Sequence, residues 1–139
     1  MKRFRSQKGA ALLEAAITIP IILLICVGIF EFGRAYQTWQ VLTNAAREGA
    51  RLACLSGPTD ADVRTRVNTY LQNGGLTTLA DSRIVINRAA ALGSSTGSLV
   101  QVNYPFSFMV LNPIVRMVTP QSTTGTPITM HAQSLMRNE

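Results

Sequence analysis

Histidine and cysteine are scarce in this 139-residue chain, which holds one histidine, His131, and two cysteines, Cys26 and Cys54. A structural zinc site needs about four ligands of these types, and three scattered residues cannot supply it. On one continuous helix the two cysteines would lie about 42 Å apart, far beyond disulfide reach. The sequence also lacks a paired-histidine motif, a glycine-rich phosphate loop and a nucleophile elbow. These absences predict a protein that is not an enzyme and has no cofactor or metal.

Charged residues are also few, at 14% of the chain, and they are unevenly placed. Of the 13 basic residues, four lie in the first eight positions, namely Lys2, Arg3, Arg5 and Lys8. The other nine nearly balance the seven acidic residues, so the net charge of +6 mostly reflects this N-terminal cluster. A near-neutral remainder does not favour nucleic acid as a partner, although a DNA-binding subunit stays as an alternative.

A long apolar run follows the basic cluster, and it carries no charge from Ala15 to Phe30. As a helix, Ala15 to Tyr36 would span roughly 30 Å, enough to cross the core of a bilayer. The basic flank predicts a cytoplasmic N-terminus and export of the rest, in a single-pass protein of the inner membrane that contacts lipid. A secretory signal peptide cut after Ala35 is the other interpretation, but it places Arg34 beside the cut.

Gly9 is followed by four small or apolar residues and then by Glu14, the pattern of a type IV prepilin-like leader. The wider run from Gly9 to Ala53 resembles the TadE-like pseudopilins of tight-adherence pilus systems. The residues that carry the resemblance are Gly9, Glu14, Pro20, Gly28, the run from Glu31 to Ala35 and the run from Ala45 to Arg51. They cover about the first third of the chain.

The resemblance implies that a prepilin peptidase cuts between Gly9 and Ala10. It also implies an assembly subunit that supports pilus biogenesis and surface adhesion. Its partners would be other pilin or pseudopilin subunits and the inner-membrane assembly machinery, and it could enter the pilus after processing. An ordinary bitopic membrane protein with a small exported binding or sensor domain is the alternative function.

Glu14 is the residue to which the resemblance assigns a role in assembly. In pilin-like assemblies the equivalent glutamate pairs with the N-terminal amine of a neighbouring subunit, and cleavage would free that amine on Ala10, about one helical turn away. A carboxylate that reaches interfacial water is the alternative. Pro20 lacks an N–H and predicts a kink in the helix, with Thr18 bonding the carbonyl that is freed on Ala16.

The helix is expected to continue beyond the membrane from Glu31 to Leu55. Apolar residues at helical spacing predict its buried stripe, formed by Phe32, Ala35, Tyr36, Trp39, Leu42, Ala46, Gly49, Ala50 and Ala53. Small residues near its end permit close helix packing, namely Ala45, Ala46, Gly49, Ala50 and Ala53. The surface that they meet is either the chain's own exported domain or a neighbouring helix.

The rest of the chain predicts a second helix and a small sheet. Thr59 and Asp62 form a capping box, and the helix ends at Asn73 before two glycines. Strands are predicted at 83–89, 98–109 and 128–136, with a polar turn at 93–98, a helical turn at 112–118 and a loop at 119–127. Pro105 predicts a sheet edge or a bend.

These elements predict an α+β fold. It has a long N-terminal membrane-spanning helix with a periplasmic extension, a second short helix, and a small antiparallel sheet of about three strands. The expected divisions are a leader peptide at 1–9, a transmembrane and assembly helix at 10–55, and a small exported α+β domain at 56–139.

Overall fold

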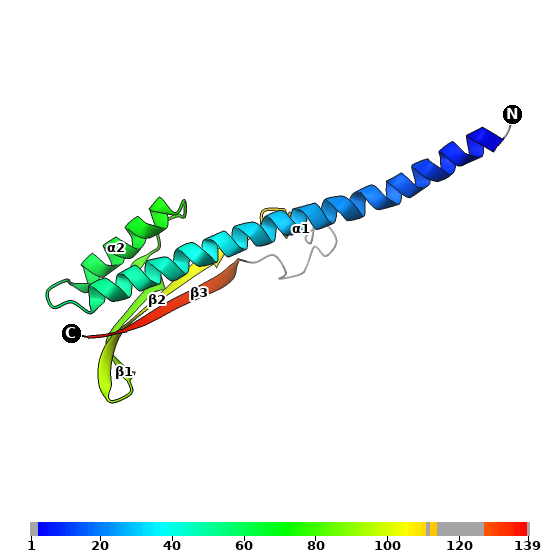
Figure 1. The fold of residues 1–139 in the computed structure, drawn as a ribbon. Coiled ribbons are helices and arrows are strands. Elements are labelled where there is room, and N and C mark those ends of the chain that lie inside the picture. Colours follow the sequence, from blue (N-terminus) through cyan, green and yellow to red (C-terminus); the bar gives the residue numbers. More distant parts are fainter. Residues whose placement is uncertain (1–2, 111, 114–126, 139) are drawn as a thin grey trace. The chain divides into compact units, whose positions relative to one another are not determined.

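The computed structural model of the chain describes residues 3–110, 112–113 and 127–138, with side chains from residue 9 onward. Its elements are α1 (Arg3–Ala53), α2 (Asp60–Asn73), the short 3-10 helix η1 (Asp81–Arg83), β1 (Ile84–Leu92), β2 (Ser95–Phe106) and β3 (Ile128–Arg137), shown in Figure 1. The predicted fold class is confirmed: a long apolar helix, a short second helix and a three-stranded antiparallel sheet. The predicted turn at 112–118 and loop at 119–127 lie almost wholly outside the described residues.

The chain forms two compact units. Unit 1 contains Met1–Gly33 and Phe108–Gly125, and unit 2 contains Arg34–Ser107 and Thr126–Glu139. Helix α1 contributes its first part to unit 1 and its last five turns to unit 2. In unit 2, helix α2 and the three strands gather around these last turns of α1 (Figure 1). The predicted divisions at residues 9 and 55 stay predictions.

The buried face of α1 differs from the predicted stripe. Phe32, Tyr36 and Trp39 are 68%, 62% and 47% exposed, so the aromatic part of that stripe is wrong. The buried positions are Glu31, Thr38, Leu42, Ala45, Ala46, Gly49, Ala50 and Ala53. These positions also recur at intervals of three, four and seven, so helical periodicity alone allowed both faces. From Leu42 onward the predicted positions Leu42, Ala46, Gly49, Ala50 and Ala53 are all buried. This second half of the prediction therefore agrees with the structure.

Helix α2 begins and ends as its sequence predicts. The Thr59 hydroxyl accepts a hydrogen bond from the Asp62 backbone N–H, and the Asp62 carboxylate accepts one from the Thr59 backbone N–H, which completes the capping box. The Thr59 hydroxyl also donates to that carboxylate and lowers the pKa of Asp62. At the other end Gly75 has a φ of 77°, and Leu76 N–H donates to Leu71 O over 2.9 Å, as in a Schellman motif.

The sheet has the order β1-β2-β3, and both strand pairs are antiparallel. Leu92 pairs with Ser95, so a tight hairpin with Gly93 at a φ of 61° replaces the predicted polar turn at 93–98. The backbone of these Ser, Thr and Gly residues pairs with β1 and β3, which outweighs their low strand propensity.

Pro105 lies in the central strand, so of the two predicted settings, an edge strand or a bend, the edge strand is wrong. Strand β1 pairs with β2 only as far as Val102, whereas β3 continues to pair to Phe106. Residue 105 therefore has a strand neighbour on one side only. A proline is tolerated there because no strand pairs with this residue on the β1 side, so its missing N–H breaks no hydrogen bond between strands.

The core of unit 2 is made where α1, α2 and the sheet meet. Buried aliphatic side chains come from both α-helices and all three strands: Leu42 and Ala46 from α1, Val63, Val67 and Leu71 from α2, and Ile84, Val100, Val102 and Ala132 from the strands. The predicted apolar faces of α2 and β2 supply most of them. This core fixes the position of the last turns of α1.

Candidate membrane and assembly segment

The proposed cleavage site lies within helix α1, since Gly9 and Ala10 follow two turns of helix that begin at Arg3. Both residues are exposed, and a Cβ added to Gly9 would meet nothing within 4 Å. A protease acts on extended backbone, so a cut here requires local unwinding of the helix. Glycine lowers the free-energy cost of unwinding by up to about 1 kcal/mol relative to alanine. Gly9 and Ala10 are thus exposed to solvent, and the helix unwinds more easily at Gly9 than it would at alanine.

Glu14 lies one turn further along the exposed surface of α1. Within the part of the chain that the structure describes, nothing donates a hydrogen bond to its carboxylate. The neighbouring side chains Leu12, Leu13 and Ile17 are 72%, 66% and 60% exposed. A carboxylate among exposed apolar side chains is costly to move into a bilayer unless a cation joins it.

The apolar part of α1 makes it a helix that could span a membrane by length and composition. None of its most apolar window is buried within the structure, and the leucine, isoleucine and phenylalanine side chains from Ile19 to Phe30 are more than half exposed. Pro20 lies inside the continuous helix. Thr18 donates to the Glu14 carbonyl over 2.7 Å, so it does not bond the Ala16 carbonyl as expected, because the hydroxyl reaches the carbonyl four residues back.

Glu31 is fully buried in unit 1, and no role was predicted for its carboxylate beyond the resemblance. The Val110 backbone N–H donates to Glu31 Oε1 over 2.5 Å. One residue further along the helix, the rings of Phe32 and Phe108 meet edge to face, with centroids 6.5 Å apart. The segment after β2 therefore lies along this turn of α1. The sequence feature that could have pointed to Glu31 is its position as an isolated carboxylate directly after the charge-free run.

Arg34 makes the corresponding contacts in unit 2. Its guanidinium donates to the Ser107 carbonyl over 2.8 Å and lies 5.2 Å from the centroid of the Phe106 ring. A cation over an aromatic face contributes about 0.5–1 kcal/mol at an exposed site. This contact holds the end of β2 close to α1.

The small residues predicted for helix packing lie in the core of unit 2. Ala45, Ala46 and Ala50 are fully buried, and Ala53 is 3% exposed. A Cβ added to Gly49 would lie 2.6 Å from Val67 Cγ2 on α2 and 3.2 Å from Val100 Cγ1 on β2. In this chain the small face of α1 is therefore covered by its own second helix and its own sheet.

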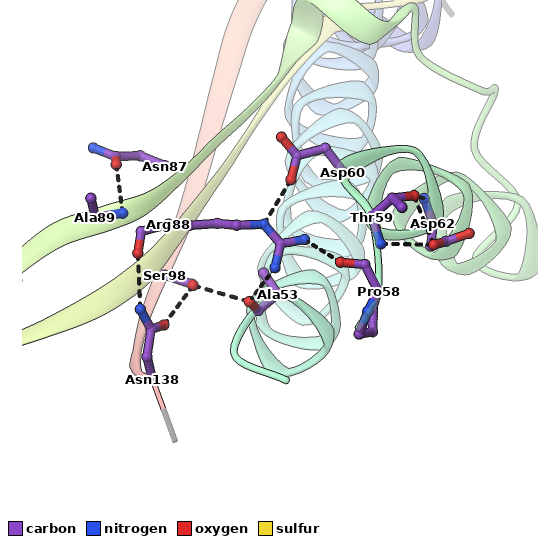
Figure 2. A network of polar contacts seen from close by, with 10 residues as sticks. All are labelled: Ala53, Pro58, Thr59, Asp60, Asp62, Asn87, Arg88, Ala89, Ser98 and Asn138. Atoms are coloured by element: carbon purple, nitrogen blue, oxygen red, sulfur yellow. Dashed lines mark hydrogen bonds and ion pairs between the residues drawn. The ribbon is translucent and has the colours of Figure 1, made fainter. Parts of the chain in front are cut away.

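A polar network around Arg88 joins four segments of unit 2 (Figure 2). The guanidinium donates to the Ala53 carbonyl at the end of α1, to the Pro58 carbonyl before α2, and to the Asp60 carboxylate, over 2.7 to 2.9 Å. Arg88 lies on the same face of β1 as Ile84, Ile86 and Ala90, beside a register shift in the pairing with β2 between Asn87 and Ala90. The network was not predicted because the partners of Arg88 lie 28 to 35 positions away in the sequence.

The end of β3 joins the same network. Asn138 donates from its side chain to the Arg88 carbonyl over 2.9 Å and accepts from the Ser98 hydroxyl over 2.7 Å. The Ser98 hydroxyl is fully buried and also lies 3.1 Å from the Ala53 carbonyl. The last turn of α1 is thus capped by Arg88 of β1, whose guanidinium donates to a carbonyl that the helix leaves without a partner.

A charge cluster links α1 to α2 at the surface of unit 2. The Glu48 carboxylate accepts hydrogen bonds from Arg51 on its own helix and from Arg66 on α2, with shortest distances of 2.9 and 2.7 Å. These bonds, with that from Arg51 first, lower the pKa of Glu48 from 4.5 to about 2. Among the described residues, no group of three or more His, Cys, Asp or Glu side chains could hold a metal ion.

Comparison with known proteins gives one match. The family model described as TadE-like protein matches residues 9–51, which begin at Gly9 and end within the small-residue face of α1. No curated protein and no solved structure matches the chain. The resemblance drawn from the residues is confirmed over this range, where the chain is similar to the TadE-like family.

Proposed function

We propose that this chain is a pilin-like assembly subunit, or pseudopilin, of a tight-adherence pilus system, and that it supports pilus biogenesis and surface adhesion. A prepilin peptidase removes the leader at 1–9 by cutting between Gly9 and Ala10. Residues 10–55 then form the transmembrane and assembly helix, and residues 56–139 form the exported domain. The TadE-like match, which starts at Gly9, supports this proposal.

The observation that carries the proposal is the setting of Glu14. It is the only charged residue from Gly9 to Phe30, it is exposed, and its carboxylate receives no donor from the described chain. The cut gives Ala10 a free α-amine about 6 Å along the helix axis from Glu14. Pairing this amine with the Glu14 carboxylate of a neighbouring subunit offsets the cost of placing both charges among apolar side chains. The pairing also favours one axial register between subunits.

The charge pattern supports a single orientation in the inner membrane. The basic cluster before Gly9 keeps the N-terminus in the cytoplasm, and the rest of the chain is exported. Other pilin or pseudopilin subunits and the inner-membrane assembly machinery are the partners, and the exposed apolar side chains of α1 contact lipid before assembly. After processing, the subunit enters the pilus.

The test is the N-terminus of the mature chain. The full chain is expressed with a prepilin peptidase of a tight-adherence system, or with a catalytically inactive form of it, and its intact mass is measured after membrane extraction. Loss of residues 1–9 with the active enzyme alone supports the proposal, and an uncut chain with both contradicts it. Gly9→Val is expected to block the cut, whereas Gly33→Val, at another open glycine of α1, leaves it unchanged.

A further inference from the structure

The segment that follows β2 presents apolar side chains beside α1. Phe108, Met109 and Val110 belong to unit 1 together with Glu31 and Phe32. Met109 is 63% exposed and Phe32 is 68% exposed. Residues 107–110 belong to neither a helix nor a strand, so their backbone groups depend on other partners.

Glu31 supplies one such partner. Its buried carboxylate accepts the backbone N–H of Val110, which has no partner in regular secondary structure. Irregular backbone is excluded from the hydrocarbon region of a bilayer unless its polar groups are satisfied within the protein. The buried Glu31 acceptor at the end of the apolar run satisfies one of these backbone groups, as a position at membrane depth requires.

The apolar surface of this segment continues that of the helix. The exposed apolar side chains of α1 run to Ile29 and Phe30, and Phe32 follows within one turn. Phe108 packs edge to face on Phe32, and Met109, the next residue along the chain, is exposed. Phenylalanine side chains also favour insertion into the apolar core of a bilayer. A patch that is continuous with the lipid-facing side of a membrane helix fits lipid as its occupant.

We propose that Phe108–Val110, with Phe32, forms a second membrane contact that inserts into the lipid at the exported edge of α1. Glu31 is a positioning residue that binds the Val110 backbone N–H and so holds the segment against the helix. The inference rests on the proposed membrane crossing of α1. It adds a bilayer contact to a region of the chain that lies outside the TadE-like match.

The test measures the depth of a nitroxide at Met109→Cys. The full chain carries Cys26→Ser and Cys54→Ser and is reconstituted in phosphatidylcholine and phosphatidylglycerol vesicles. Collisions of the nitroxide with oxygen report lipid, and collisions with a water-soluble nickel chelate report water. Ile22→Cys in the apolar run is the lipid control, and Val85→Cys on β1, where Val85 is 47% exposed, is the water control. At residue 109 the nitroxide is expected to collide with oxygen several-fold more often than with the nickel chelate, as it does at residue 22.

The outcomes separate this inference from the proposed function. A label at 109 that behaves as at 85, while 22 reports lipid, overturns the second contact and leaves the membrane crossing in place. A label at 109 that neither reagent reaches means a protein partner covers the patch, and this also overturns the inference. A label at 22 that reports water overturns the membrane crossing and the inference with it.

The role of Glu31 is tested in the same assay. Glu31→Gln keeps a side-chain oxygen that can accept from Val110 N–H, whereas Glu31→Ala removes the acceptor. The label at 109 is expected to stay in lipid with Gln and to shift several-fold towards nickel with Ala, while 22 is unchanged in both. An unchanged depth at 109 with Ala would overturn the positioning role.

Discussion

The close approach of α1 to α2 and β2 at Gly49 predicts the effect of a single added methyl group. In Gly49→Ala the new Cβ would lie 2.6 Å from Val67 Cγ2, whereas carbon atoms rest at about 3.5–4.0 Å. Val67 must therefore move by about 1 Å within a packed core. Overpacking of this kind costs about 1–3 kcal/mol, and the better helix propensity of alanine offsets up to about 1 kcal/mol. We expect a net loss of about 1–2 kcal/mol.

Native-state hydrogen exchange of the full chain in detergent micelles measures this loss. Backbone amides of β2 around Val100 are expected to exchange roughly 5 to 30 times faster in Gly49→Ala than in the parent. Gly33→Ala is the control, because a Cβ there meets nothing within 4 Å, and it should leave exchange in β2 unchanged.

A double-mutant cycle with Val67→Ala tests the stated cause. Val67→Ala removes the methyl group that Gly49→Ala would strike, at a cost of about 2 kcal/mol for the cavity. In that background Gly49→Ala should become neutral or stabilising, with a coupling of about 1–3 kcal/mol. Equal or slower exchange in Gly49→Ala, or a coupling near zero, would refute the account of this contact.

Three further predictions concern charged side chains. Arg88→Ala removes the donor to the Ala53 and Pro58 carbonyls and should destabilise unit 2 by about 2–4 kcal/mol in the exchange assay, with partial retention in Arg88→Lys. The folded pKa of Glu48, about 2, lies below its ordinary value, so its stabilising effect is complete above about pH 4.5 and is lost as the pH falls towards 2. Solvent around its exposed arginine partners reduces this effect to about 1 kcal/mol. In Glu48→Gln the free energy of unfolding should therefore change less than in the parent as the pH falls from about 4.5 towards 2. Glu14→Ala should leave leader cleavage intact but lower the amount of the chain in sheared pili, and parental amounts would contradict the pairing role.

The sequence was sufficient for features that local chemistry determines. The capping box at Thr59 and Asp62, the glycine-terminated end of α2 and the apolar alternation of β2 follow from neighbouring residues. The small residues of α1 also stood out, although not the surface that they meet. Gly9 and Glu14 could be singled out because their spacing is itself the motif.

Features that depend on distant residues could not be predicted. The buried face of α1 includes Glu31, whose carboxylate accepts a hydrogen bond from the Val110 backbone N–H, and these two residues lie 79 positions apart. Arg88 becomes a cap for α1 only because the fold brings β1 beside the Ala53 carbonyl, 35 positions earlier in the chain. Pro105 fits a central strand only because β1 stops short of it. In each case tertiary contacts decided a choice that periodicity left open.

Zero-length carbodiimide crosslinking of assembled pili tests the central claim most directly, because it joins an amine to a carboxylate only where the two already pair. Subunits labelled with nitrogen-14 and nitrogen-15 are mixed before assembly, and crosslinked peptides are identified by mass spectrometry. The account predicts an amide bond from the Ala10 α-amine to Glu14 that combines one light and one heavy peptide. The account would be contradicted if both peptides of every crosslink carried the same isotope, or if Ala10 were still joined to Gly9.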